Sequence, residues 1–287
     1  MSDGALIKGG FSVALNKKVC FSQGNLQFQA STNLWRFAEH QWDWIGDANK
    51  KISSTNSGWI DLFGWGTSGW ISGANAYQPY SVSTDSKDYC IGSVQEIKSL
   101  GAAAIKIQKE FGEIPLNSYK NDMTGKFSNA DWGVYNKISN GGNQAGMWRT
   151  LTSEEWKYLL YTRVKAANLI GLGTINNVKG LILLPDNWEN TLSVKFKCTH
   201  NNYFSNVFSS EVWSVMESYG AVFLPLAGHR KGTEVFNVGS SGYYWSSSAY
   251  SRNKTCYHLW VDSYGFVFSE NGNRSEGGAV RLVQDIK

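Results

Sequence analysis

The sequence contains little charge, little proline and no long hydrophobic run. Charged residues make up 17% of the 287 residues, and only 4 residues are proline. Soluble globular chains usually carry about 25% charged residues. No apolar stretch approaches the roughly 20 residues of a membrane helix. Disorder is also excluded, because disordered chains are poor in aromatics, which reach 14% here. This composition indicates a compact, loop-rich body with weakly charged surfaces.

A dense basic cluster is also missing. The net charge is +4, and the basic residues are scattered, with only short runs such as Lys17-Lys18. Nucleic-acid binders gather their basic residues on one face or stripe. We therefore expect no nucleic-acid partner. The N-terminal segment Met1–Lys8 has an apolar run of only three residues, so the chain shows no signal peptide. Either the protein is made without a leader or the leader has been removed, and we expect no membrane insertion by this chain.

The cysteines form no recognisable motif. There are 4 of them, and none belongs to a C-x-x-C pair, so neither a zinc ribbon nor a thioredoxin-type site is indicated. We expect free, buried thiols at Cys20, Cys90, Cys198 and Cys256. One or two disulfides are the alternative if the protein is exported.

The apolar patterns predict both strands and helices. Alternation over Phe11–Phe21 predicts a β-hairpin, and Leu34–Phe37 another short strand. Apolar runs at Leu181–Leu184 and Ala221–Leu224, each followed by proline, predict buried strands. Four helices are predicted from their N-terminal signals: capping boxes at Ser93/Glu96 and Thr152/Glu155, and caps at Asn129 and at Ser209 or Ser210. No linker or repeat divides the chain, which predicts one α+β domain over residues 1–287.

A glycine- and tryptophan-rich segment runs from Gly58 to Gly73. It carries Trp59, Trp65 and Trp70. Such a segment is typical of a long structured loop whose indoles pack back onto the body. The alternative, functional interpretation is that these indoles bind a ligand directly.

The C-terminal part changes character. Between Tyr243 and Gly278 there are nine aromatics in 36 residues, with serine and asparagine between them. This is the composition of adaptable recognition surfaces. Strand-like pieces are separated by predicted turns at Ser263–Gly265 and Asn271–Asn273. Alternation within the strand 257–262 puts apolar side chains on one side and His258, Trp260 and Asp262 on the other. We expect that second side to be exposed and to make contacts.

These residues resemble a known family. Tyr244–Ser248, then a Ser/Tyr/Asn stretch, then Asn273–Ser275 and Ala279–Val283, resemble the C-terminus of bacterial C-type-lectin-fold proteins. The similar branch is related to formylglycine-generating enzyme and to the variable proteins of diversity-generating retroelements. Further segments resemble its gut-bacterial members: Gly58–Thr67, Asn129–Gly133, Trp148–Thr152, Leu183–Asp186 and Phe223–Pro225. The resemblance covers nearly the whole chain except the stretch at about 85–124, which we expect to be a helical insertion.

The resemblance implies a C-type lectin fold whose last strands form a ligand-binding face on a rigid body, with 243–287 as the variable region. A retroelement would rewrite adenine-bearing codons there. Trp245, Leu259, Val261, Val280 and Leu282 would hold the fold. The implied face consists of Tyr250, Ser251, Arg252, Asn253, Lys254, Tyr257, His258, Trp260, Asp262, Tyr264, Phe266, Phe268, Glu270, Asn271, Asn273, Ser275 and Glu276.

The implied function is non-enzymatic binding of a protein or glycan on a cell or virus surface, with the protein itself at the cell surface or on a virion. One alternative is an invariant surface adhesin or phage receptor-binding domain of the same fold. A less favoured one is an enzyme of the formylglycine-generating type, since Cys198 and Cys256 match no motif of it. Enzyme signatures such as G-x-S-x-G, H-E-x-x-H and a phosphate loop are missing from the sequence. We expect no catalytic residues and no cofactor.

We also expect no bound metal. The histidines His40, His200, His229 and His258 lack ligand spacing. The calcium motifs of animal-type lectins are missing too, and Asp186–Asn190 offers only one Asp and one Glu. Calcium takes 6–8 oxygen ligands. A calcium ion at this loop is kept as the minor alternative.

Overall fold

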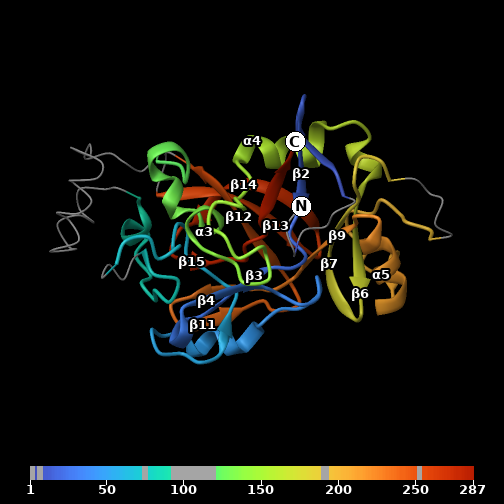
Figure 1. The fold of residues 1–287 in the computed structure, drawn as a ribbon. Helices are drawn as coiled ribbons and strands as arrows, with labels where there is room; N and C mark the ends of the chain where they lie inside the picture. Colours follow the sequence, from blue (N-terminus) through green and yellow to red (C-terminus); the bar gives the residue numbers. More distant parts are fainter. Residues whose placement is uncertain (1–3, 5–8, 73–76, 92–120, 189–193, 251–253) are drawn as a thin grey trace.

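The structure, a computed structural model, describes residues 4, 9–72, 77–91, 121–188, 194–250 and 254–287. These residues form a mixed α+β fold, with most strands gathered in several small sheets and few helices (Figure 1). The predicted α+β class is confirmed. The helix predicted from Ser93 lies outside the described residues. Of the residues beside it, Ile91 and Met123 are buried in the main core, and Tyr89 is also buried.

The strands are short. They are β1 Phe11–Ala14, β2 Lys17–Phe21, β3 Leu26–Gln29, β4 Leu34–Phe37, β5 Trp59–Ile60, β6 Ile170–Ile175, β7 Val178–Leu183, β8 Val207–Phe208, β9 Val222–Pro225, β10 His229–Lys231, β11 Glu234–Phe236, β12 Gly242–Ala249, β13 Thr255–Asp262, β14 Gly265–Asn273, β15 Glu276–Gly277 and β16 Val283–Ile286. The predicted strand 34–37 and the strands predicted at 181–184 and 221–224 are confirmed, apart from end residues.

The α-helices are α3 Trp132–Tyr135, α4 Ser153–Lys157 and α5 Ser210–Ser218, and α4 continues into the π-helix η7 Tyr158–Thr162. Short 3₁₀-helices are η1 Ala30–Thr32, η2 Gly46–Lys51, η4 Ser86–Tyr89, η6 Gly125–Ala130 and η8 Ala166–Asn168. The capping box of Thr152 and Glu155 is confirmed at α4, and Ser209 caps α5. The cap predicted at Asn129 is wrong. Helix α3 begins two residues later because the buried Asp131 carboxylate accepts hydrogen bonds from Gly133 N and Thr150 N.

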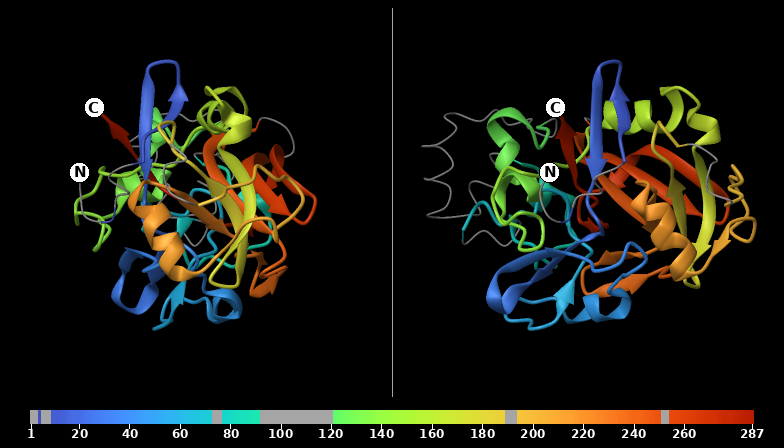
Figure 2. Two further views of the ribbon diagram at one scale, coloured as in Figure 1. Left: turned by 90° about the vertical axis from the view of Figure 1, so that its right-hand side faces the viewer. Right: turned by 45° about the vertical axis from the view of Figure 1, so that its right-hand side comes forward.

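The two ends of the described chain meet in one sheet. The predicted hairpin forms as β1 and β2, and β16 pairs antiparallel with β2, with Val283 opposite Phe21. Figures 1 and 2 show β2 and the C-terminal strand side by side. The last strand is therefore fixed to the first hairpin, which anchors the preceding C-terminal sheet at its far end.

The tryptophan-rich segment packs inward, as predicted. Trp65 and Trp70 are buried, and the Trp65 indole donates a hydrogen bond of 2.8 Å to Ser246 O. Trp59 is half-buried under the Arg36 guanidinium, 3.8 Å from the ring centroid. This hydrogen bond therefore ties the buried Trp65 to strand β12.

All four cysteines lie in described residues, and none forms a disulfide. The predicted free thiols are confirmed, and Cys20, Cys90 and Cys256 are buried. The predicted burial of Cys198 is wrong. It is exposed in an irregular stretch between β7 and β8.

Candidate ligand-binding face

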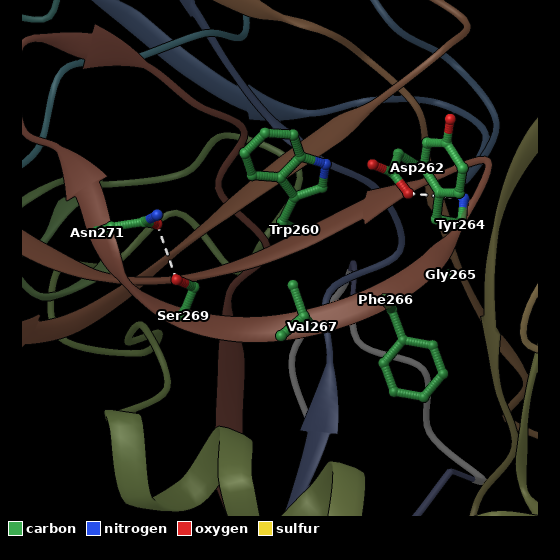
Figure 3. Close-up of a pocket in the computed structure, with 8 residues that line it drawn as sticks. All are labelled: Trp260, Asp262, Tyr264, Gly265, Phe266, Val267, Ser269 and Asn271. Atoms are coloured by element: carbon green, nitrogen blue, oxygen red, sulfur yellow. Dashed lines mark hydrogen bonds between the residues drawn. The ribbon is translucent and has the colours of Figure 1, made fainter.

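The C-terminal sheet β12–β13–β14 has two different sides. In this antiparallel sheet Leu259 lies opposite Phe268, and Trp260 lies opposite Val267. Opposed residues project from the same side. One side, here called the α4 side, carries Tyr244, Leu259, Val261, Phe266 and Phe268. The other, here called the outer side, carries Tyr243, His258, Trp260, Val267 and Ser269. Figure 3 shows Phe266 directed away from Trp260 and Val267.

The α4 side is covered by the body. Leu259 and Val261 are 0% exposed in a core that also contains Trp156 of α4. At its edge, Tyr257 stacks on Phe268 with ring centroids 5.8 Å apart, and Lys157 Nζ lies 5.0 Å from the Tyr257 ring. These side chains link the sheet to helix α4.

The helix extension η7 also reaches this side. The Tyr161 ring stacks on Phe266 at 6.4 Å, and its hydroxyl accepts a hydrogen bond of 3.0 Å from Phe268 N. The prediction that the Phe266 and Phe268 rings point outward is therefore wrong, although both are half-buried and Phe266 also lines the hollow at the edge of the sheet. Their register partners, Val261 and Leu259, direct both rings to the half-buried edge of the core.

At one end of the outer side, here called the base, the side chains of His258 and Tyr243 are buried. His258 is only 1% exposed and stacks on Tyr243, with ring centroids 5.3 Å apart and planes 8° apart. The prediction that His258 is exposed is wrong, because Tyr243, Trp245 and Trp260 surround it. Neither of its ring nitrogens has a hydrogen-bond partner among the described residues. Burial lowers the pKa of His258 to about 4.

The other end of the outer side, around the turn between β13 and β14, is here called the tip and is open to solvent. A concavity of about 400 Å³ is lined there by Trp260, Asp262, Tyr264, Gly265, Phe266, Val267, Ser269 and Asn271. Tyr264, in the predicted turn 263–265, is 90% exposed, and Val267 is 52% exposed. The Asp262 carboxylate accepts a hydrogen bond of 2.8 Å from Tyr264 N, which fixes the turn. Ser269 Oγ donates to Asn271 Oδ1 at 2.7 Å (Figure 3). Polar and aromatic groups thus surround an accessible hollow.

The predicted turn at Asn271–Asn273 is wrong. These residues belong to β14, where the register shifts opposite Cys256 and His258. Glycine within a strand often marks a bulge or a site where another backbone approaches closely. At Gly272 an added Cβ would lie 2.7 Å from His258 Nδ1 and 2.9 Å from Cys256 O. Glycine at this position therefore lets the strand lie against the buried histidine.

The other predicted face residues divide by burial. Glu270 and Asn271 are exposed, while Tyr250, Lys254, Tyr257, Trp260, Asp262, Asn273 and Glu276 are half-buried. The predicted residues Ser251, Arg252 and Asn253 lie outside the described residues. Ser275 is fully buried, so its prediction as a surface residue is wrong. Its hydroxyl donates a hydrogen bond of 3.1 Å to Thr84 O, which ties the segment before η4 to the sheet.

Sequence reasoning missed residues that complete the outer side. The His229 ring of β10 lies 4.7 Å from Tyr243 and 5.4 Å from Phe236 of β11. An aromatic row therefore continues from the C-terminal sheet onto β10 and β11. No local pattern could reveal it, because the pairing of β10 with β15 is a long-range contact. Val267 could have been found, since strict alternation separates it from Phe266.

Asp186 is the described acidic residue of the loop considered for calcium, and its carboxylate already binds other side chains of the protein. Its carboxylate accepts a hydrogen bond of 2.6 Å from Ser12 Oγ and forms ion pairs with Arg163 at 3.1 Å and Lys18 at 3.2 Å. Glu189 lies outside the described residues. In the part of the chain that the structure describes, no group of three His, Cys, Asp or Glu side chains could hold a metal ion.

Comparisons of the chain with protein-family models, with curated proteins and with solved structures give no match. Among the described residues, no helix is both long and apolar enough to cross a bilayer.

Proposed function

We propose that this chain is a non-enzymatic ligand-binding protein with a C-type lectin scaffold, whose outer side is diversified by a retroelement. One observation carries the proposal. At the tip of the outer side, Trp260 and Val267 project from strands whose opposite side chains are fixed in the core, and Tyr264 projects from the turn between these strands. Side chains in this position can contact a partner without being needed to hold the sheet together.

The backbone supports this division. Strand β13 pairs with β12 on one edge and with β14 on the other, so its hydrogen bonds do not depend on which outer side chains it carries. Leu259 and Val261 bury the opposite side completely. A rigid platform of this kind lowers the ordering cost of binding. The ligand in this proposal is a protein or glycan on another cell or on a virus.

The cysteines favour binding over catalysis of the formylglycine-generating type. Such chemistry needs a reactive thiolate. Cys256 is fully buried, and burial raises the pKa of its thiol far above the usual range. Cys198 is exposed, and burial raises the pKa of its thiol as well. The charge of Arg274 lowers the pKa of Cys256, but burial has the larger effect, so this thiol is not activated as a nucleophile.

A combinatorial library tests the proposed function. Trp260, Tyr264, Val267 and Asn271 are randomised together, displayed on yeast and selected for binding to an unrelated protein such as hen lysozyme. We expect most variants to resist protease and some to bind. The matched control library randomises Leu259, Val261 and Tyr244 on the α4 side, and we expect nearly all of its members to be degraded. Equal protease sensitivity of both libraries would refute the proposal.

The retroelement part has a separate test. The DNA around the gene is sequenced for a near-copy of the 3′ end and for a reverse-transcriptase gene. Both are expected beside a diversified protein. If neither is present, the invariant adhesin or phage receptor-binding domain becomes the better account of the same surface.

A further inference from the structure

We infer that the hollow at the tip of the outer side receives a cationic side chain, arginine or lysine, from a protein ligand. The cation lies between the Trp260 and Tyr264 rings and pairs with the Asp262 carboxylate. This inference rests on the proposed function and specifies the chemistry of its ligand. It selects a protein over a glycan as the partner.

The charge around the hollow is negative. Asp262 is the only charged residue among the described residues that line it. Within the described chain, no Lys, Arg or His nitrogen lies within 4.0 Å of its carboxylate. One carboxylate oxygen accepts from Tyr264 N, and that bond orients the group. A half-buried carboxylate without a counter-ion gains from an incoming cation.

A second carboxylate extends the negative region. The pKa of Tyr243 is raised to about 12 by burial first and then by the charges of Glu276 and Asp262. Tyr243 therefore lies within the field of both acids, which come from β15 and β13. Lys231 lies opposite Glu276 in the ladder and lowers its pKa, but burial has the larger effect and raises it. The chain as a whole carries +4, so this acidity is local.

The two histidines of the aromatic row do not cancel it, and His200 packs against Phe266, which projects from the α4 side. Burial lowers the pKa of His258 to about 4 and lowers that of His229 too. Both rings are therefore neutral at pH 7 and act as part of the aromatic row. Lysine does approach an aromatic ring on the α4 side, where Lys157 covers Tyr257. A cationic ligand is consequently favoured on the outer side and disfavoured on the α4 side.

The aromatic groups suit a cation. Figure 3 shows the Trp260 and Tyr264 rings on the same side of the hairpin, with the Asp262 carboxylate between them. Indole is the best cation–π partner among the side chains. Guanidinium stacks on aromatic rings while its planar fork pairs with a carboxylate. Tyr243 supports the Trp260 ring from behind, with centroids 4.9 Å apart. Trp260 and Asp262 are thus held in place before the ligand arrives, while the exposed Tyr264 ring is free to close on it.

The test uses single amino-acid probes and a resonance that reports on Trp260. The protein is labelled with 5-fluorotryptophan, and Trp260→Phe identifies the ¹⁹F signal. The probes are Nα-acetyl-arginine amide, its neutral isostere Nα-acetyl-citrulline amide, and methyl mannoside. We expect arginine amide to shift the Trp260 signal saturably, with a Kd of roughly 1–30 mM. Citrulline amide and the mannoside should leave the signal unchanged.

Matched variants complete the test. Asp262→Asn keeps an oxygen to accept from Tyr264 N but removes the charge, so we expect at least about fivefold weaker arginine binding. Glu234→Gln removes an exposed acid of β11 outside the hollow, and we expect unchanged binding. No arginine-dependent shift, an equal response to citrulline, or an unaffected Asp262→Asn variant each overturns the inference. Saturable binding of the mannoside instead would assign the hollow to a glycan. A negative result beside a protease-resistant outer-side library would leave the proposed function standing.

Discussion

The α4 side and the outer side belong to the same three strands, yet they differ in what covers them. Leu259 and Val261 are buried against α4 and the core. Trp260 and Val267, which alternate with core residues along the same strands, project from the opposite side and are partly exposed to solvent. Backbone hydrogen bonds hold both sides equally. The difference teaches that alternation within one sheet can place core side chains on one side and solvent-exposed side chains on the other.

The outer side is not exposed along its full length. At the base, His258 and Tyr243 are buried, since His229 of β10 packs against Tyr243. At the tip, beyond Trp260, no described segment covers the hollow around Tyr264. Only the tip is therefore free to change. Four predictions sharpen this comparison.

The largest difference is expected between the two sides at neighbouring positions. Leu259→Ala removes a fully buried side chain and should lower the free energy of unfolding by about 2–5 kcal/mol. Val267→Ala on the outer side should change it by less than about 0.5 kcal/mol. Urea denaturation measures both. Similar costs for the two variants would mean that the outer side is part of the core.

The buried histidine at the base should make the fold sensitive to acid. Its pKa falls from 6.5 in the unfolded chain to about 4 in the fold. The folded state therefore binds its proton less readily, and stability is lost as the pH falls from 6.5 to 4. The loss from this group is about 3 kcal/mol.

His258→Phe isolates this contribution, because every other titrating group is the same in both proteins. Since neither ring nitrogen has a described partner, phenylalanine should be tolerated at pH 7. Urea unfolding at pH 7 and pH 4.5 should show a smaller acid loss in the variant. Identical pH profiles would show that His258 is not buried in its neutral form.

The bulge on β14 gives the next effect. In Gly272→Ala the new methyl group would contact Cys256 O at 2.9 Å and the His258 ring at 2.7 Å, so we expect a loss of about 1–3 kcal/mol in thermal unfolding. Gly58→Ala is the control, because its nearest atom is 3.4 Å away. A stable Gly272→Ala protein would argue against the tight packing of β14 on the outer base.

The smallest effects concern two tyrosines that the sequence assigned to one face. Tyr264→Ala should change stability by less than about 0.5 kcal/mol, because the ring is 90% exposed. Tyr257→Ala loses its stack on Phe268 and the contact with Lys157, which should cost about 1 kcal/mol. Calorimetry of both variants decides whether Tyr257 belongs to the α4 side, and equal costs would contradict its placement.

The sequence predicted the alternation along β13 and the turn before Gly265, since both depend on neighbouring residues. It failed where contacts with distant strands determine the direction and burial of a side chain. Phe266 and Phe268 were assigned to the face from the family resemblance, but their register with Val261 and Leu259 turns them inward. His258 is buried by side chains that include Tyr243 of another strand. The C-type lectin fold and the retroelement stay predictions.

The central claim is that the tip of the outer side can differ without harm to the fold. The most direct measurement is the melting temperature of a protein carrying Trp260→Ala, Tyr264→Ala, Val267→Ala and Asn271→Ala together. We predict a cooperative transition within about 5 °C of the natural protein. A drop of more than about 10 °C, or loss of the transition, would contradict the claim.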